Sequence, residues 1–263
     1  MATTGSADRP KAGKAQMHLG TKAGSLAPHC LLVGSPKRAN WIARRILVRV
    51  TDLKNDRGLD CYTGFYNDVP MSVVTTGMGG GSTGIVLPEA VRSGARRFIR
   101  VGSCSALQRD AWVGDAIIAT GAVRLDGTSN SYAPIEYPAV ADYRVVMELE
   151  LAAKALPWRY SVGIGATCAD FNEGQARPDD SGYVPPRLKA LHDELSRRGV
   201  VCYDMEDSTI FTWCTTHGGL WAGSVKAAFG NRANNKLKLG AGESQAITIG
   251  LSALHALATK YPL

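Results

Sequence analysis

The sequence predicts a single α/β domain in which helices cover a β-sheet, and two observations support this fold class. Short apolar, β-rich runs alternate with helical patterns along most of the 263 residues, as they do in α/β proteins. No internal repeat and no linker rich in Pro, Gly or Ser divides the chain, and its length suffices for one large core. We therefore expect one domain rather than two.

The alternation can be followed from the first strand to the last helix. Strand-like runs precede helical patterns at 29–34 and 39–47, and again at 70–76 and 82–95. The later runs are strand-like at 97–104, 115–124, 160–169 and 221–231, and helical at 144–156, 186–199 and 243–261, and a further run with apolar residues lies at 200–218. In α/β folds, ligands gather at the loops that follow the carboxyl ends of the strands.

The first sixteen residues differ in composition from the rest. They are polar and rich in Ala, Gly, Lys and Thr, which predicts a disordered tail at 1–16 and a folded domain at 17–263. The tail lacks the apolar core of a secretion signal, and no apolar run is long enough to span a bilayer. We expect a cytoplasmic protein without a membrane partner.

The cysteines and histidines form no metal-binding pattern. The six cysteines are scattered without a CxxC pair, and the five histidines include no HExxH motif. Such cysteines are typical of reduced, mostly buried thiols in an intracellular protein. We therefore expect no metal site.

The net charge of +7 is compatible with two kinds of partner, a nucleic acid or an anionic small molecule. The basic residues are spread along the chain, and no basic patch is interleaved with aromatic residues. We therefore do not expect a nucleic-acid partner, and a solvated basic surface explains most of the charge. A few arginines remain as candidates for a specific anion site.

Three of these arginines lie beside small residues at predicted strand ends. Gly34 follows a strand-like run, and Arg38 leads into a helical pattern, so backbone amides and a guanidinium can face one anion. Arg57 lies in a predicted turn, and Arg100 is followed closely by Ser103. Together these residues predict a site for a dianion.

A glycine-rich stretch, TTGMGGGSTGI at 75–85, lies between a strand-like run and a helical pattern. It is not a P-loop, because the Gly-Lys-Ser/Thr ending is missing. The spacing of Gly79, Gly81 and Gly84 matches a dinucleotide fingerprint, but basic and apolar residues at 97–101 stand where that motif needs an acid. We interpret the stretch as a sharp strand-to-helix turn.

Six motifs in this order and spacing resemble the nucleoside phosphorylase family, and within it the members that cleave uridine. They are TGMGGGST, FIRVGSCSALQ, VGDAIIATGAVRLDG, YAPIEYPAVADY, FNEGQAR and CYDMEDST. The resemblance runs from about residue 17 to the end. It implies a central mixed, twisted and partly barrel-like sheet flanked by helices. It also implies phosphorolysis of a pyrimidine nucleoside, in which uridine and phosphate give uracil and ribose 1-phosphate.

The resemblance also implies the binding residues. Phosphate would be bound by Gly34, Arg38, Arg57, Arg100 and Ser103, in agreement with the dianion site, because guanidinium groups match phosphate geometry. The ribose would contact Met205 and Glu206, the carboxylate accepting hydrogen bonds from the 2′- and 3′-hydroxyls. His18 matches a histidine that reaches the ribose of a neighbouring subunit, which implies a homodimer or homohexamer with shared sites.

The base-binding residues implied by the resemblance are Phe171, Gln175 and Arg177, with Cys104 and Ser105 beside them. A side-chain amide both donates and accepts, as uracil requires. Arg177 and Gln175 would stabilise the charge of the departing base, and Arg100 would act at the phosphate. Neither a cofactor nor a covalent intermediate is implied. The purine-specific relatives carry an aspartate in a late loop, where this chain has Asn231 and Arg232.

Several residues depart from the family pattern. Gly58 replaces a glutamate that helps to bind a monovalent cation in some relatives, so we expect no such site. The others are Ser35, Ser103, Ser105, Asn172, Glu173 and Asp204. Glu173 would place a carboxylate close to Arg177. These departures leave three alternatives open: a purine or broad-specificity phosphorylase, a nucleoside hydrolase, and a weakly active or inactive homologue that binds nucleosides.

Overall fold

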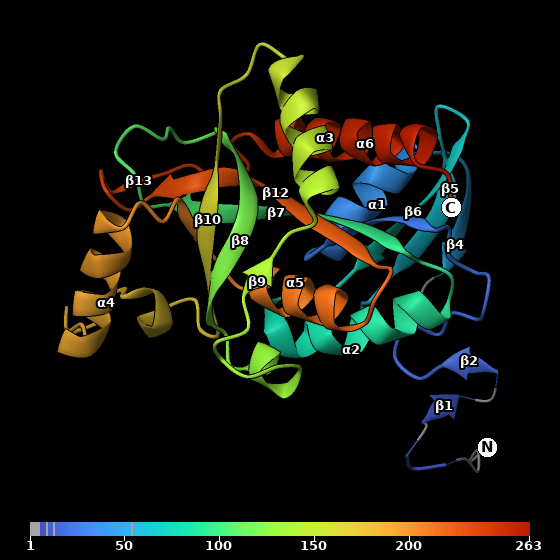
Figure 1. Ribbon diagram of the computed structural model, residues 1–263, viewed down its shortest axis with the longest axis horizontal. Coiled ribbons are helices and arrows are strands. Elements are labelled where there is room, and N and C mark those ends of the chain that lie inside the picture. The colour runs from blue at the N-terminus through green and yellow to red at the C-terminus, as the bar shows by residue number, and fades with distance from the viewer. Residues whose placement is uncertain (1–5, 9, 13, 54) are drawn as a thin grey trace.

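The computed structural model describes residues 6–8, 10–12, 14–53 and 55–263. Within them, eleven strands form one large mixed sheet (Figure 1). The sheet strands are β3 (His29–Val33), β4 (Val48–Leu53), β5 (Cys61–Tyr66), β6 (Val69–Thr75), β7 (Arg97–Ala106), β8 (Ala116–Leu125), β9 (Ala139–Val140), β10 (Tyr160–Cys168), β11 (Cys202–Asp204), β12 (Trp221–Asn231) and β13 (Lys236–Leu237).

Part of this sheet closes on itself. The spatial order is β13-β12-β8-β10-β11-β7-β3-β6-β5-β4, with β9 beside β8. Since β12 also pairs with β7 in parallel, the strands β12, β8, β10, β11 and β7 form a ring. Parallel pairs such as β3 with β6 occur beside antiparallel pairs such as β5 with β6. The predicted single-domain α/β fold with a mixed, partly barrel-like sheet is thus confirmed.

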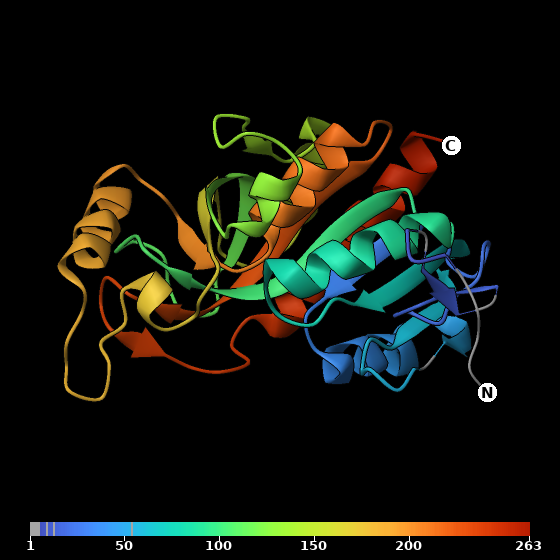
Figure 2. The same cartoon turned by 90° about the horizontal axis from the view of Figure 1, so that it is seen from below.

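Helices cover both faces of the sheet. The main helices are α1 (Pro36–Arg45), α2 (Gly79–Arg92), α3 (Tyr143–Lys154), α4 (Pro186–Arg197), α5 (Asp207–Thr216) and α6 (Glu243–Lys260). Helices α1, α3 and α6 share one hydrophobic core with the sheet, and α2 and α5 share the other. Figure 2 shows α2 and α5 side by side in front of the sheet, with α4 at the far end.

The glycine-rich stretch forms the predicted turn. Strand β6 ends at Thr75, and α2 begins at Gly79, whose φ of 82° is one that side chains disfavour. A Cβ on Gly80 would lie 2.5 Å from Oγ1 of Thr209 and 2.8 Å from Oγ1 of Thr128. Glycine therefore lets the first turn of α2 approach α5 closely.

The N-terminal segment contains two short strands before the main sheet begins. Strands β1 (Lys11–Ala12) and β2 (Ala15–Gln16) pair antiparallel. Gln16 is buried, and its Oε1 accepts a hydrogen bond from Nε of Arg92 at 2.8 Å. The end of this segment is therefore held against α2 by a side-chain hydrogen bond. Residues 1–5, 9 and 13 of the predicted tail lie outside the described residues.

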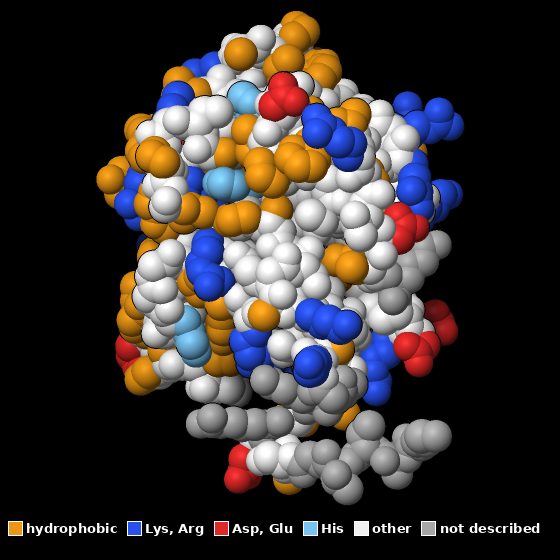
Figure 3. Space-filling model, turned by 90° about the vertical axis from the view of Figure 1, so that its right-hand side faces the viewer, with side chains coloured by type: hydrophobic (Ala, Val, Ile, Leu, Met, Phe, Trp, Pro, Cys, Tyr) orange, Lys and Arg blue, Asp and Glu red, His pale blue; other side chains and the backbone are white. Residues whose placement is uncertain are grey.

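Surface features bear on two expectations about partners. In the face shown in Figure 3, lysine and arginine side chains are scattered among polar and apolar ones rather than gathered in one patch. None of the helices in the described part of the chain combines the length and apolar character needed to cross a membrane.

All six cysteines are buried free thiols.

Candidate active site

A cavity of about 810 Å³ lies where several strands and their following loops meet. It is lined by the end of β3, the start of α1, the glycine-rich turn, the C-terminal half of β7, and the loops after β10 and β11. Its lining residues include all the predicted site residues except His18: Gly34, Arg38, Arg57, Arg100, Ser103, Cys104, Ser105, Phe171, Gln175, Arg177, Met205 and Glu206. The topology thus brings residues far apart in the sequence into one site.

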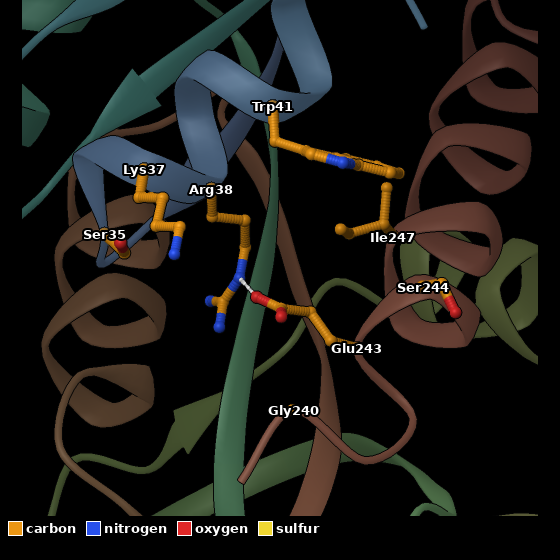
Figure 4. Close-up of a pocket in the computed structure, with 8 residues that line it drawn as sticks. All are labelled: Ser35, Lys37, Arg38, Trp41, Gly240, Glu243, Ser244 and Ile247. Atoms are coloured by element: carbon orange, nitrogen blue, oxygen red, sulfur yellow. Dashed lines mark hydrogen bonds and ion pairs between the residues drawn. The ribbon is translucent and has the colours of Figure 1, made fainter. Parts of the chain in front are cut away.

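Arg38 is held from two sides at the basic end of this cavity. Its Nε donates to Oε1 of Glu243 at 2.5 Å, and its Nη1 donates to the carbonyl of Val101 at 3.1 Å. Figure 4 shows Arg38 pointing from α1 toward Glu243, which stands in the first turn of α6. These two bonds fix the direction of the guanidinium and leave Nη2 for another partner. Arg57 lines the same cavity from an exposed loop between β4 and β5.

The close-up in Figure 4 is centred on a smaller cavity of about 390 Å³ beside this end. It shares Ser35 and Arg38 with the large cavity. Lys37 and Trp41 of α1 line it on one side, and Glu243 lies across from them. The basic end of the active-site cavity therefore adjoins a second hollow between α1 and α6.

Arg100 and Glu206 connect the basic end to the middle of the cavity. Nη2 of Arg100 donates to Oε2 of Glu206, and both residues are almost completely buried. Oε1 of Glu206 accepts a hydrogen bond from the backbone N–H of Gly79 at 2.8 Å, at the N-terminus of α2. Burial raises the pKa of Glu206 above its ordinary value, while the nearby Arg100 acts in the opposite direction.

The turn that carries Met205 and Glu206 is fixed by Asp204. Oδ2 of Asp204 accepts from the backbone N–H of Asp207 at 2.9 Å, and more weakly from that of Glu206 at 3.3 Å. Its Oδ1 accepts from Oγ1 of Thr167 at 2.6 Å. The carboxylate of Asp204 therefore caps the start of α5 and aims the two following side chains at the cavity.

Arg177 and its neighbours form the opposite end. Nη1 of Arg177 donates to Oε1 of Gln175 at 2.7 Å, and Nη2 donates to Oγ of Ser105 at 3.0 Å. The guanidinium carbon lies 3.8 Å from the ring centroid of Phe171, a cation–π contact. Burial, and secondarily Arg232, lowers the pKa of Arg177 to about 10, so the group stays charged at neutral pH.

Beside this end, Glu173 does not pair with Arg177 as expected, whereas Cys104 lines the cavity. Glu173 is exposed, and the ion pairs within the described residues include none between Glu173 and Arg177. The expected carboxylate partner of Arg177 is thus replaced by the amide of Gln175. Cys104 lines the cavity, but burial raises the pKa of its thiol well above the ordinary value, as does the neighbouring Cys202. Cys104 is therefore a packing residue in its thiol form.

His18 lies away from the cavity of its own chain. Its Nδ1 is 2.8 Å from Oε1 of Glu89, and the backbone N–H groups of His18 and Leu19 also donate to that carboxylate. Glu89 of α2 therefore anchors the N-terminal segment. The predicted role of His18 concerns the site of a neighbouring subunit, which a single chain does not contain.

Arg232 does not line the cavity, but it supports the loop that carries Gln175, a role that the sequence interpretation missed. Its Nη1 donates to the carbonyl of Gln175 at 2.7 Å, and its Nη2 donates to that of Ala176 at 3.0 Å. Ala176 has a left-handed φ of 52°, so these bonds hold a tight turn in place. The only available signal was the Asn231–Arg232 pair at a strand end, which gave no indication of a backbone-binding role. Asn231 is also turned inward, because its Nδ2 donates to the carbonyls of Gln108 and Ala111.

Among the residues that the structure describes, no group of three or more His, Cys, Asp or Glu side chains is placed to hold a metal ion. The charged groups that line the cavity are instead arginines at both ends and the carboxylates of Asp204 and Glu206 between them. Such a distribution suits an elongated ligand with an anionic group, a hydroxylated centre and a planar polar ring.

The fold is that of a phosphorylase, and comparison with known families agrees. The sequence profile of the phosphorylase superfamily matches residues 28–249, and the chain belongs to this superfamily.

Individual relatives cover most of the chain. It is 41% identical over 254 residues to a uridine phosphorylase of Thermococcus kodakarensis, covering 96% of this chain and 91% of the relative. It is 36% identical over 223 residues to a uridine phosphorylase of Klebsiella aerogenes, covering 84% of this chain and 87% of the relative. A guanosine phosphorylase of Halorubrum lacusprofundi is 31% identical over 232 residues, covering 81% of this chain and 87% of the relative.

Proposed function

We propose that this protein is a pentosyltransferase that catalyses the phosphorolysis of uridine to uracil and ribose 1-phosphate. The observation that carries this proposal is the single cavity with Arg38 and Arg100 at one end and the Gln175–Arg177 pair at the other. The uridine phosphorylases among the relatives support the same reaction. Inorganic phosphate is the co-substrate, and the reaction needs no further cofactor.

At the sugar, the reaction proceeds through an oxocarbenium-like state. Arg38, Arg100 and Ser103 hold phosphate below C1′ of the ribose, so that the nucleophile is in place as the glycosidic bond stretches. Glu206 accepts hydrogen bonds from the 2′- and 3′-hydroxyls, and Met205 packs against the sugar. Phosphate oxygen then bonds to C1′ while the electron pair of the C1′–N1 bond leaves with the base.

At the base, stabilisation of the leaving group replaces general acid catalysis. The charge that develops on uracil is met by the guanidinium of Arg177 and the amide of Gln175, which are already oriented by each other and by Ser105. Phe171 covers the ring. Asn231, at the position where a purine-specific acid would stand, donates its amide hydrogens to backbone carbonyls.

A broad or purine specificity is the second candidate, since a guanosine phosphorylase is among the relatives. A hydrolase would not need the arginines that converge on the basic end. An inactive nucleoside-binding homologue would bind uridine without cleaving it.

We further propose a homodimer, or a homohexamer built from dimers, in which His18 of one subunit meets the ribose bound by its neighbour. The position of His18 outside its own cavity supports this proposal. We expect the enzyme to act in the cytoplasm, in keeping with its buried free thiols.

Release of the free base from uridine, thymidine and inosine, with and without phosphate, tests the reaction and its specificity. We expect uracil from uridine only when phosphate is present. Preferential cleavage of inosine would favour the purine alternative, and uracil release that is independent of phosphate would identify a hydrolase. Binding of uridine without any release of base would identify an inactive homologue.

A further inference from the structure

Lys226 is a lysine with no exposed surface in the middle of the closed part of the sheet. It stands in β12 between β7 and β8, opposite Gly102 on β7 and Ile117 on β8. Fully buried lysines are rare and need a partner of opposite charge. Its Nζ donates to Oδ2 of Asp207 and lies 3.9 Å from Oδ2 of Asp204. The site residues described above do not include this lysine, and it does not line the cavity.

The pair lies directly behind the proposed phosphate and ribose ligands. Asp204, Glu206 and Asp207 place three buried carboxylates within four residues, and the cations facing them are Arg100 and Lys226. Burial works against the charged form of Lys226, but the attraction of Asp207 and Asp204 outweighs it and raises the pKa of Lys226. The lysine therefore carries its charge at neutral pH.

Arg100 lies between two of these carboxylates. Its Nη2 is bonded to Glu206, and its Nε lies 4.0 Å from Oδ1 of Asp207. Within the part of the chain that the structure describes, Nε and Nη1 of Arg100 and Oδ1 of Asp207 have no hydrogen-bond partner. A small movement would therefore join Arg100 to Asp207, and the strength of that attraction depends on how far Lys226 neutralises the carboxylate.

We propose that Lys226 is a positioning residue for phosphate binding, which keeps Asp207 neutralised so that the guanidinium of Arg100 stays available to the phosphate. This inference rests on the proposed function, because it concerns the same phosphate site. Without Lys226, Arg100 is the one cation that remains to face the three carboxylates. Once ionised, Asp207 then competes with phosphate for Arg100, and its negative charge repels the incoming dianion.

A stability role alone would not require a charged pair at this position. Replacement of a buried ion pair by apolar groups of similar size is often neutral or stabilising, whereas removal of one partner leaves an uncompensated charge. The Lys226–Asp207 pair therefore offers a set of three variants, Lys226→Met, Asp207→Asn and the double variant, in which charge compensation and structure can be separated. Lys260→Met is the matched control, since Lys260 pairs with the buried Glu148 outside the cavity.

The experiment measures phosphate binding to the full-length variants by isothermal titration calorimetry between about pH 7 and pH 10. Burial, and secondarily Asp204, raise the pKa of Asp207 to about 7 even beside Lys226, so without the lysine this carboxylate ionises and competes for Arg100 only toward the alkaline end of that range. We expect Lys226→Met to weaken phosphate binding by about tenfold or more. The double variant should return to within about threefold of the unmodified protein. Asp207→Asn alone and Lys260→Met should not weaken it. Thermal unfolding of each variant reports its folded state.

Three results would overturn the proposal. The first is an unchanged phosphate affinity in Lys226→Met. The second is a double variant that is folded yet as weak as Lys226→Met. The third is weaker phosphate binding in Asp207→Asn, which would make Asp207 itself the residue that positions Arg100. If Lys226→Met does not fold, the phosphate affinity of Asp207→Asn tests the proposal instead. If the unmodified protein binds no phosphate, the proposed function fails instead.

Discussion

Arg177 reaches the cavity from a loop, and its position depends on three neighbouring side chains. Gln175 and Ser105 accept hydrogen bonds from its guanidinium, and Phe171 lies against its face. A loop arginine held in this way is preorganised, so it does not have to reorient as charge develops on the base. Arg38 of α1 and Arg100 of β7 lie at the basic end of the cavity. Among the residues that the structure describes, their side chains form no hydrogen bond with Arg177, Gln175 or Ser105.

Replacement of Arg177 should therefore separate catalysis from phosphate binding. We expect Arg177→Ala to lower kcat for uridine by about 100-fold, because a preorganised donor to the leaving group is lost. The affinity for phosphate should stay within about threefold, since Arg177 lies at the other end of the cavity. Arg187→Ala, at an exposed position of α4, serves as the control. An equal loss of phosphate affinity would show that the two ends do not act separately.

At the scale of residues, the sequence allowed the prediction of side chains that act through recognisable motifs. Arg38, Arg100, Gln175, Arg177 and Glu206 all line the predicted cavity. Arg232 and Lys226 could not be predicted in their roles. Arg232 binds backbone carbonyls of a distant loop, and Lys226 neutralises carboxylates from another element. Such contacts depend on the tertiary fold. In the sequence, Lys226 is one more basic side chain in an apolar run, and Arg232 is one in a polar loop.

Among the elements, the glycine-rich turn could be predicted from the sequence, but the reason for one of its glycines could not. The missing lysine and the missing acid were enough to reject two nucleotide motifs. The reason for Gly80 became visible only in the structure, because Thr128 and Thr209, which approach it, come from η1 (Thr128–Ser131) and α5. The N-terminal strands were not predicted for a similar reason. Their order depends on contacts of Gln16 with Arg92 and of His18 with Glu89.

Strand β3 carries a histidine that makes stability depend on pH. His29 is buried, and burial, followed by the nearby Arg97, lowers its pKa to about 4. In the unfolded chain the pKa is about 6.5. Between these values the unfolded state binds a proton that the folded state does not, so stability is fully present above about pH 6.5 and falls as the pH drops toward 4.

We expect this effect to cost about 2 kcal/mol of unfolding free energy near pH 4.5 relative to pH 7.5. Urea denaturation at both pH values measures it. In His29→Gln, whose amide oxygen can still accept from Arg97, the pH dependence should be smaller by about that amount. An identical pH dependence in the variant would show that His29 is not responsible.

For the whole molecule, alternation of strands and helices predicted the fold class but not the ring in the sheet. Closure requires β12 to pair with β7 and β8 at once, and these partners are far from it in the sequence. The expectation of a barrel-like sheet came from the family resemblance. The ring also determines function, since it brings Arg100 on β7, the turn after β11 and the loop after β10 to one cavity.

The central claim is that one cavity joins phosphate to the ribose of uridine, and ³¹P NMR of the reaction mixture tests it most directly. With uridine and inorganic phosphate, we predict a new phosphate monoester resonance from ribose 1-phosphate that grows in equal amount with free uracil. Uracil that accumulates without this resonance, or no uracil at all from a folded protein, would contradict the claim.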